Sequence, residues 1–130
     1  MADTLQFDLV SPERMLLSTE ATMVQIPGVE GDFTALPAHA PFLTTLRPGM
    51  VTVSTASGSQ VFFVSGGFAE ISGESASVLA EEAVERDALD RAFLEQKVEE
   101  AEAALEAAPD HAKMAASQRL MDFRAALSAL

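Results

Sequence analysis

Cysteine is absent from this 130-residue sequence, and basic residues are few. Without cysteine the chain has no disulfide scaffold, no thiolate metal site and no thiol nucleophile, and it suits a reducing compartment. Eight lysine and arginine residues stand against twenty aspartate and glutamate residues, so the formal net charge is −12. Because such a charge repels nucleic acid and anionic lipid, we predict no nucleic-acid partner.

Long apolar segments are also missing. No run approaches the roughly 20 residues that a helix needs to cross a bilayer, and residues 1–4 are followed at once by alternating residues rather than by the apolar core of a secretory signal. We therefore expect a soluble chain with no direct membrane insertion. A unit of this length buries roughly two thirds of its unfolded surface, so its stability requires neither a metal nor a disulfide.

The first 82 residues alternate with a period of two, which predicts β-strands. Apolar and polar residues alternate over residues 5–9. Over residues 22–26, Thr22, Val24 and Ile26 alternate with Met23 and Gln25. Turn signals at residues 57–58 and 73–74 predict hairpins. Short strands at this spacing are typical of a sandwich or a barrel. Residues 61–64, Val-Phe-Phe-Val, are apolar on both faces, so their strand should be buried on both sides or covered from outside the sheet.

After Glu82 the apolar residues follow a helical period. We expect Asp87 to cap a first helix and Asp110, after the break at Pro109, to cap a second. The sequence thus predicts a β domain over residues 1–84 and an antiparallel helical hairpin over residues 85–130. Each helix presents one apolar face, formed by Leu94, Val98, Ala101 and Leu105 in the first and by Ala116, Leu120, Phe123, Leu127 and Leu130 in the second.

Candidate catalytic and metal-binding groups are scarce. His39 and His111 lie in different halves of the chain, and neither has a carboxylate at a recognised ligand spacing. No serine lies in a Gly-x-Ser-x-Gly motif. Gly66 and Gly67 lack the following Lys-Ser/Thr of a phosphate loop, so we expect them to relieve crowding at a bend. The sequence therefore predicts no catalytic residue, no metal site and no cofactor.

Residues 27–49 hold four prolines and three glycines, a density that fixes the path of surface loops. Since no nucleophile or metal cluster accompanies them, this segment is predicted to contact another molecule. It also contains three of four ordered blocks that resemble the epsilon subunit of bacterial F-type ATP synthase. The blocks are Pro-Gly-Val-Glu-Gly-Asp at 27–32, Leu-Pro-Ala-His-Ala-Pro at 36–41, Leu-Arg-Pro-Gly at 46–49 and Val-Ser-Gly-Gly-Phe-Ala-Glu at 64–70.

The resemblance covers residues 5–82 in order and spacing, and the opening Phe-Asp-Leu-Val-Ser-Pro-Glu at 7–13 resembles the first strand of the family. It implies an α+β fold, with a ten-stranded flattened antiparallel β-sandwich followed by two antiparallel helices. It also implies a non-catalytic rotor subunit of the central stalk, which binds the gamma subunit and the c ring and couples proton translocation to ATP synthesis. Such a subunit is peripheral to the cytoplasmic face of the bacterial inner membrane, through the complex.

Particular residues match partner-binding positions of the family. Glu30, Gly31 and Asp32 match the loop that faces the c ring, and His39 falls in the neighbouring loop. Ser11 matches a position that faces the gamma subunit. An acidic loop tip of this kind steers and positions a partner more than it tightens binding.

The helical half departs from the family pattern. Many members bind ATP through Leu/Ile-Asp-x-x-Arg-Ala early in the first helix; here Leu89 and Asp90 match, but Phe93 and Leu94 replace Arg-Ala. Arg91 lies two residues early, turned by roughly 200° around the helix, so no nucleotide site is predicted.

Many members also inhibit ATP hydrolysis by extending a basic C-terminal helix into the catalytic alpha and beta subunits. Residues 87–106 carry seven acidic and two basic residues, and residues 110–128 carry three basic and two acidic ones. We therefore hypothesise weak inhibition or none. A different interpretation is a free-standing β-sandwich binding module with a ligand-responsive helical arm, which co-purification with a gamma subunit would distinguish.

Overall fold

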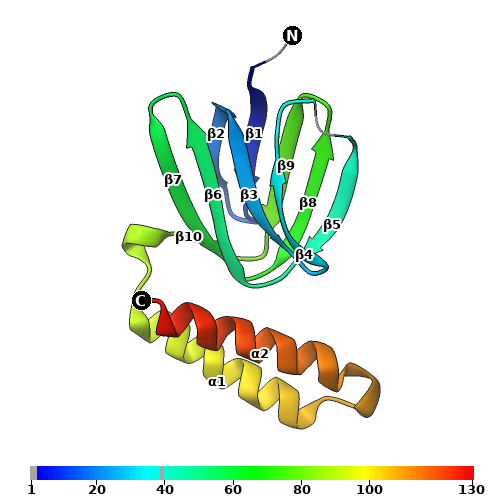
Figure 1. Cartoon of the computed structure of the whole chain (residues 1–130). Helices are drawn as coiled ribbons and strands as arrows, with labels where there is room; N and C mark the ends of the chain where they lie inside the picture. Colours follow the sequence, from blue (N-terminus) through cyan, green and yellow to red (C-terminus); the bar gives the residue numbers. More distant parts are fainter. Residues whose placement is uncertain (1–2, 39) are drawn as a thin grey trace. The chain divides into compact units, whose positions relative to one another are not determined.

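The computed structural model describes residues 3–38 and 40–130. The chain divides into two compact units, Met1–Arg86 and Asp87–Leu130. Among the described residues, the first unit contains ten strands and the second contains two α-helices (Figure 1). The strands are β1 (Leu5–Val10), β2 (Met15–Ala21), β3 (Met23–Gly28), β4 (Gly31–Ala35), β5 (Phe42–Leu46), β6 (Gly49–Thr55), β7 (Gly58–Val64), β8 (Gly67–Ser72), β9 (Ser75–Ala80) and β10 (Ala83–Glu85).

The strands form one continuous sheet that folds over on itself as a sandwich. Its order is β10-β7-β6-β3-β5-β8-β9-β1-β2, and β4 pairs with β3 beside this path. The two layers join where β3 meets β5 through a single pairing, Gly28 with Leu46. Among the described residues every pair is antiparallel except β1 with β9, which is parallel. The ten-stranded sandwich is thus confirmed, with one departure from a fully antiparallel arrangement.

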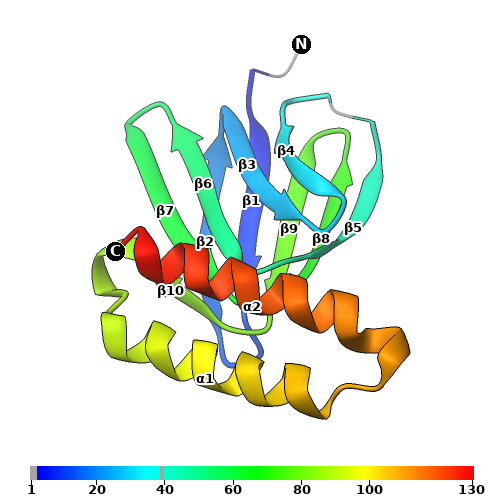
Figure 2. The same ribbon diagram turned by 60° about the horizontal axis from the view of Figure 1, so that its bottom comes forward.

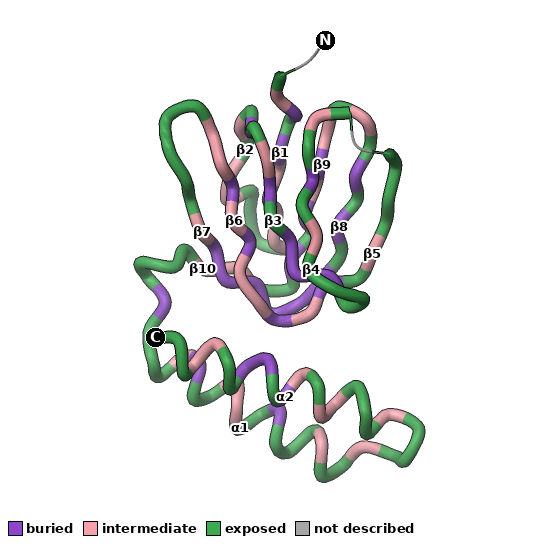
Figure 3. The backbone as a smooth tube through the Cα atoms, in the orientation of Figure 1, coloured by how far each residue is buried: buried purple, intermediate pink, exposed green. Residues whose placement is uncertain are grey.

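The core of the sandwich lies between the two layers, where the strands bury alternate residues (Figure 3). In β1, for example, Leu5, Phe7 and Leu9 are buried and the residues between them are not. Burying one such side chain contributes about 1.5–3 kcal/mol. Phe62 and Val64 of β7 belong to this core, and Phe63 is buried on the opposite face of the strand. The two-sided burial expected of this strand is therefore confirmed for these three residues.

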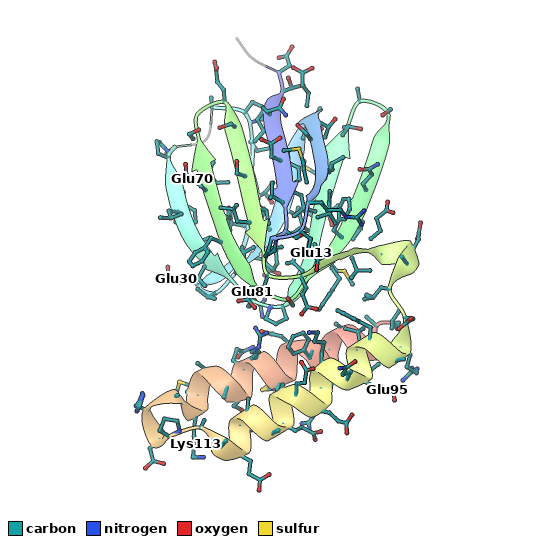
Figure 4. The ribbon with its side chains drawn as sticks, turned by 180° about the vertical axis from the view of Figure 1, so that it is seen from behind. Glu13, Glu30, Glu70, Glu81, Glu95 and Lys113 are labelled. Carbon is teal, nitrogen blue, oxygen red and sulfur yellow. The ribbon has the colours of Figure 1, made fainter. Side chains whose placement is uncertain are left out.

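Most of the charged residues in the turns of the sandwich lie at one of its ends. β1, β5 and β9 run in one direction in one layer, and β3 and β7 run in one direction in the other. All five strands finish at this end, as Figure 1 shows. Figure 4 shows Glu13, Glu30 and Glu81 here, with Glu70 farther along β8. We call this end the acidic end; its connections are residues 11–14, 29–30, 47–48, 65–66 and 81–82.

Two predicted hairpin turns differ in their outcome. Ser72 pairs with Ser75, so the turn predicted at residues 73–74 is confirmed. Thr55 pairs with Gly58, so the β6–β7 turn consists of residues 56–57 rather than 57–58. Gly58 has a φ of 140° and begins β7, which explains why the sequence needs glycine just after the turn.

The second unit is an antiparallel hairpin of α1 (Arg91–Ala107) and α2 (Lys113–Ser128), which pack side by side (Figure 2). Leu94 and Ala101 are buried on α1, and Leu120 and Phe123 on α2, as the helical period predicts. Leu130 follows the end of α2 and is 49% exposed, so the prediction that it belongs to the apolar face of this helix is wrong. Across the hairpin, Arg124 Nη2 donates to Glu102 Oε2 at 3.0 Å.

Both predicted helix caps were wrong, because a short 3-10 helix precedes each α-helix. Asp87 lies within η1 (Arg86–Ala88), and it is Asp90 that caps α1, accepting from the Phe93 N–H through Oδ1 at 2.8 Å. Asp110 opens η2 (Asp110–Ala112), and α2 begins after Ala112 without a side-chain cap. Asp87 therefore lies four residues before the first residue of α1, and Asp110 lies three residues before the first residue of α2.

Replacing Gly67 with alanine should destabilise the sandwich by at least about 2 kcal/mol. The backbone at Gly67 has a φ of 134°, and an added Cβ would collide with the Leu79 carbonyl oxygen and lie 2.9 Å from Ala80 Cα. Crowding relief, predicted from the sequence, is thus confirmed here. Urea unfolding measures the loss. Gly73→Ala is the control, because its Cβ would meet nothing within 4 Å, and equal losses would contradict the explanation.

Replacing Asp90 with alanine should lower the stability of the helical hairpin by about 1 kcal/mol, since the first turn of α1 loses its capping acceptor. Urea unfolding followed by far-ultraviolet circular dichroism measures this change. Asp87→Ala, in η1, should cost less than about 0.5 kcal/mol. A larger effect at Asp87 than at Asp90 would mean that the helix begins where the sequence pattern placed it.

Candidate functional site

The β3–β4 turn forms a protruding tip at the acidic end. Gly28 pairs with Gly31, which leaves Val29 and Glu30 as the two turn residues. Gly31 has a φ of 138°, a conformation that side chains other than hydrogen rarely permit. Val29 is 52% exposed, and Glu30 and Asp32 are exposed as well. The three residues matched to the c-ring loop therefore lie together and exposed, with Glu30 in the turn and Gly31 and Asp32 at the start of β4.

This turn is attached to the segment that runs from β5 into β6. The Val29 N–H donates to the Thr45 carbonyl at 2.9 Å, and the Arg47 N–H donates to the Pro27 carbonyl at 3.0 Å. The Arg47 guanidinium also reaches Asp32, with Nη2 at 2.9 Å from Oδ1. Two backbone hydrogen bonds and one ion pair thus join the tip to the segment between β5 and β6.

Glycine permits the close approach that these bonds require. A Cβ on Gly28 would lie 2.8 Å from the Gly31 carbonyl oxygen. A Cβ on Gly49 would lie 2.9 Å from Pro27 Cβ. Both distances are too short for real side chains, so larger residues would push the segments apart. The blocks at 27–32 and 46–49 are therefore parts of one structural feature, although 13 residues separate them in the sequence.

The described residues on either side of position 39 lie away from the Glu30 tip. His39 itself is outside the described residues, so the prediction for it stays a prediction from the resemblance. Residues 36–38 and 40–41 follow the far end of β4, a five-residue strand that spans about 17 Å. Ala38, with a φ of 66°, donates its N–H to the Gly73 carbonyl at 2.7 Å. This anchors the loop beside the β8–β9 turn, so the structure does not bring it to the Glu30 tip.

Ser11 lies in the β1–β2 turn at the acidic end. Its N–H donates to the Arg14 carbonyl at 2.9 Å, and the Arg14 N–H donates back to the Ser11 carbonyl at 3.3 Å. Since β1 runs parallel to β9, the turn lies next to the β9–β10 connection. A pocket of about 220 Å³ separates the two; it is lined by Ser11, Pro12, Glu13, Arg14, Leu16, Glu81, Glu82, Ala83 and Val84.

The outer face of the β5-β8-β9-β1-β2 layer carries a feature that sequence reasoning missed. Strand register places its outward side chains in rows that cross the strands. The row nearest the acidic end, which we call the apolar row, consists of Phe68, Leu79, Val10 and Met15, with Thr45 at its β5 end. The next two rows are largely polar: Leu43, Glu70, Ser77, Asp8 and Ser18, then Ser72, Ser75, Gln6 and Glu20.

The apolar row is accessible. Phe68 is 54% exposed, Leu79 51% and Met15 56%, while Val10 is half-buried between them. From β8 to β2 the row spans about 14 Å, the width of three strand spacings. A signal for it exists in the sequence: β8 buries Ala69 and Ile71 but also has an outward Phe68. An apolar residue at an outward position of a strand indicates an apolar outer surface rather than a further part of the core.

The remaining sequence-predicted positions, Leu89 and Asp90, lie just before α1. Leu89 is buried, and Asp90 caps the helix. Phe93, which stands where the family has arginine, lies 5.4 Å from Lys97 Nζ. Within residues 3–38 and 40–130, no three acidic or histidine side chains gather as a metal-ligand group. Over the same residues, the helices are too short or too polar to span a membrane.

Comparison with known proteins identifies the family. The family described as the ATP synthase delta/epsilon chain, β-sandwich domain, matches residues 4–86. The ATP synthase epsilon chain of Rhodobacter capsulatus is 50% identical over 125 residues, covering 96% of this chain and 95% of that protein. The epsilon chain of a Jannaschia species is 48% identical over 127 residues, covering 98% and 96%.

Solved structures share the fold at low sequence identity. A chain of the Euglena gracilis mitochondrial ATP synthase structure, described as OSCP/F1/c-ring, aligns with a TM-score of 0.77 and 22% identity over 99% of this chain and 82% of that one. A chain of the Tetrahymena thermophila mitochondrial central stalk and c-ring structure aligns with a TM-score of 0.63 and 16% identity, covering 95% and 96%. The predicted resemblance is confirmed, as is the prediction of a non-catalytic subunit of a larger complex. The chain belongs to the epsilon-chain family of F-type ATP synthase.

Proposed function

We propose that this chain couples rotor parts of ATP synthase by binding the gamma subunit through the apolar row and the c ring through the β3–β4 turn. The observation that carries the proposal is the continuity of the two surfaces at the acidic end of one rigid sandwich. Coupling of proton translocation to ATP synthesis requires a part that transmits torque without deforming. The sandwich meets this requirement, because its core is continuous and close-packed.

The apolar row suits a permanent protein partner. Exposed large side chains scattered singly are ordinary, but a contiguous apolar patch rimmed by polar residues is typical of an interaction site. Here Phe68, Leu79 and Met15 are each more than half exposed and lie in one row. Ser11, the residue matched to a gamma-facing position, directly follows Val10 of that row. The gamma subunit is therefore the occupant that we assign to this surface.

The β3–β4 turn suits a polar partner such as the loops of the c ring. Its tip is exposed and acidic, and its backbone is tied to the β5–β6 connection. A preorganised turn loses little conformational freedom on binding, which favours affinity. The related Tetrahymena chain belongs to a structure described as the central stalk and c ring. By this arrangement the chain is peripheral to the cytoplasmic face of the bacterial inner membrane and reaches it only through the complex.

Shortening Leu79 should weaken binding to the gamma subunit at least about five-fold, the effect expected for an interface residue worth more than 1 kcal/mol. Leu79→Ala removes apolar contact area from the middle of the apolar row. Its matched control is Leu36→Ala in the β4–β5 loop, because the two leucines are 51% and 49% exposed. Titration calorimetry with purified gamma subunit measures both dissociation constants.

Equal losses for the two leucines would contradict the assignment of the apolar row to gamma. A wild-type chain that forms no stable complex with gamma would overturn the proposed function itself. That outcome would favour the free-standing binding module instead. Urea unfolding of both variants, which should agree within about 0.5 kcal/mol for exposed positions, shows that any loss of binding is not a loss of folding.

The helical hairpin contributes little inhibition of ATP hydrolysis in this proposal. Residues 87–130 carry nine acidic and five basic residues, so the unit is negative overall. Of the basic side chains on α2, Arg124 is paired with Glu102 and Arg119 lies 5.0 Å from the ring centroid of Phe123. Insertion between the acidic surfaces of catalytic subunits would break these contacts and place like charges together, which is unfavourable.

Deleting residues 87–130 should therefore leave ATP hydrolysis by the assembled enzyme within about two-fold of the wild-type rate, a change below 0.5 kcal/mol in barrier height. The measurement is the steady-state ATPase rate of reconstituted complexes that contain equal amounts of the subunit. A several-fold rise would show that the hairpin is an effective inhibitor despite its charge. Substituting Arg124→Gln, which only breaks the pair with Glu102, provides the comparison in a full-length chain.

A further inference from the structure

We propose that the gamma subunit adds a β-strand to the free edge of β2 and so extends the layer that carries the apolar row. This inference rests on the proposed binding of gamma at that row. It adds a second kind of contact, because the row supplies apolar area whereas strand addition supplies backbone hydrogen bonds. The strand order ends at β2, which pairs with β1 alone among the described residues, and Figure 4 shows this layer from its outer side.

The register of the neighbouring strands shows which backbone groups of β2 face this edge. Gln6 of β1 donates its N–H to the Glu74 carbonyl on the β9 side, so Gln6 and its β2 partner Glu20 form a non-hydrogen-bonded pair. The N–H and C=O groups of Glu20 therefore point away from β1, and by alternation those of Ser18 do as well. Both residues are exposed, and the Glu20 carbonyl accepts a long bond of 3.4 Å from the Thr19 hydroxyl.

The free edge of β2 has little of the protection that proteins give to unpaired strands. Protected edges are short, or they carry proline, lysine or inward-pointing charges. β2 has seven residues, contains neither proline nor lysine, and has its one charge, Glu20, on the outer face. A register shift between Leu9 and Val10 disturbs the pairing only at the acidic end. The regular edge is therefore residues 17–21, a stretch about 17 Å long that suits a short partner strand.

A hollow of about 240 Å³ lies along the inner side of this edge, lined by Leu17 and Thr19 of β2 and by residues 55 and 57–60 of the β6–β7 hairpin. Leu17 and Thr19 pair with the core residues Leu9 and Phe7, so they face inward. An added strand would direct alternate side chains toward the hollow and the others onto the outer face, in line with the apolar row. We expect no acidic side chain on that strand, because neither the described lining of the hollow nor β2 contains a basic residue.

The apolar row argues for gamma as the occupant of this edge. Met15, the first residue of β2, is 56% exposed and ends the row, so the row and the free edge form one continuous surface. A partner that covers the row is thereby brought alongside the edge. A second copy of the chain is disfavoured, because each copy carries a formal net charge of −12 and the two would repel each other.

Hydrogen exchange of the full-length chain, alone and with purified gamma subunit, tests the pairing. The amide protons of Ser18 and Glu20 should exchange at least about ten-fold more slowly in the complex, because both donors become hydrogen-bonded. The Ser59 amide is the internal control. It faces the free part of β7 beside the same hollow, since its partner Ser54 is engaged by Thr22 on the other side of β6. Its exchange rate should be the same with and without gamma.

Proline substitution separates backbone pairing from side-chain contact. Ser18→Pro removes one outward donor but no hydrogen bond to β1, and it should raise the dissociation constant for gamma about five-fold, the effect of one lost hydrogen bond. The matched control Ser18→Ala loses the hydroxyl that donates to Asp8 but retains the N–H, and its affinity should stay within about two-fold of the wild type. Ser59→Pro removes the corresponding donor of β7 and should bind as the wild type does. Titration calorimetry measures binding, and urea unfolding shows whether each variant is folded.

The outcomes separate this inference from the proposed function. Gamma binding with unchanged exchange at Ser18 and Glu20 would overturn the strand addition and leave the apolar row as the gamma site. Slower exchange at Ser59 instead would put the added strand on β7, and equal losses in Ser18→Pro and Ser18→Ala would make the contact one of side chains; either result would also overturn the inference. Slow exchange at Ser18 and Glu20 in the concentrated chain alone would make a second copy the occupant.

Two further results are decisive in their own way. A wild-type chain that does not bind gamma would overturn both the proposed function and the strand addition. If Ser18→Pro fails to fold, the exchange rates of the wild-type chain with and without gamma decide the question by themselves.

Discussion

The contact between β3 and β5 governs the rest of the sandwich. Gly28 and Leu46 form the only pairing between these strands among the described residues, and through it the two layers become one sheet. The chain is closely packed around this contact: a Cβ on Gly28 would meet the Gly31 carbonyl oxygen of β4, and a Cβ on Gly49 of β6 would meet Pro27 of β3. The contact also determines where the β3–β4 hairpin leaves the sheet. The shape of the candidate c-ring contact is therefore a consequence of backbone packing rather than of the turn residues alone.

The side chains on the outer face of the β5-β8-β9-β1-β2 layer are determined by strand register. Slipping any one strand by a single residue would exchange its inward and outward side chains. Thr44, Ala69, Val78 and Leu9 occupy one inward row, and the apolar row lies one register position closer to the acidic end. The core therefore holds the apolar row in place, since its inward neighbours are buried. A surface fixed in this way presents its side chains to a partner with little cost of ordering.

Much of the fold could be predicted from the sequence, because period and turn chemistry are local. Strands such as β1, β3 and β7, the two helices and the turn at residues 73–74 follow from neighbouring residues. The groups that crowd Gly67 belong to Leu79 and Ala80 of β9, so only the need for glycine at this bend could be read locally. The parallel β1–β9 pairing and the assembly of Phe68, Leu79, Val10 and Met15 into one row could not be predicted, because both depend on which strands lie side by side. The helix caps failed for another reason. An aspartate before a helix can equally open a 3-10 turn, and only tertiary packing selects between the two.

For the candidate site as well, features set by neighbouring residues could be predicted from the sequence, and contacts between distant residues could not. The position of Glu30 at a tip follows from Gly28 and Gly31 on either side of the turn, and both are visible in the sequence. The partner of Asp32 is not visible, because Arg47 reaches it only after β5 has returned beside β3. A resemblance between sequences transfers positions but not the contacts that each position makes. Two acidic residues that match one loop therefore differ in their surroundings, because Asp32 has the ion pair with Arg47 and Glu30 stands at the turn itself.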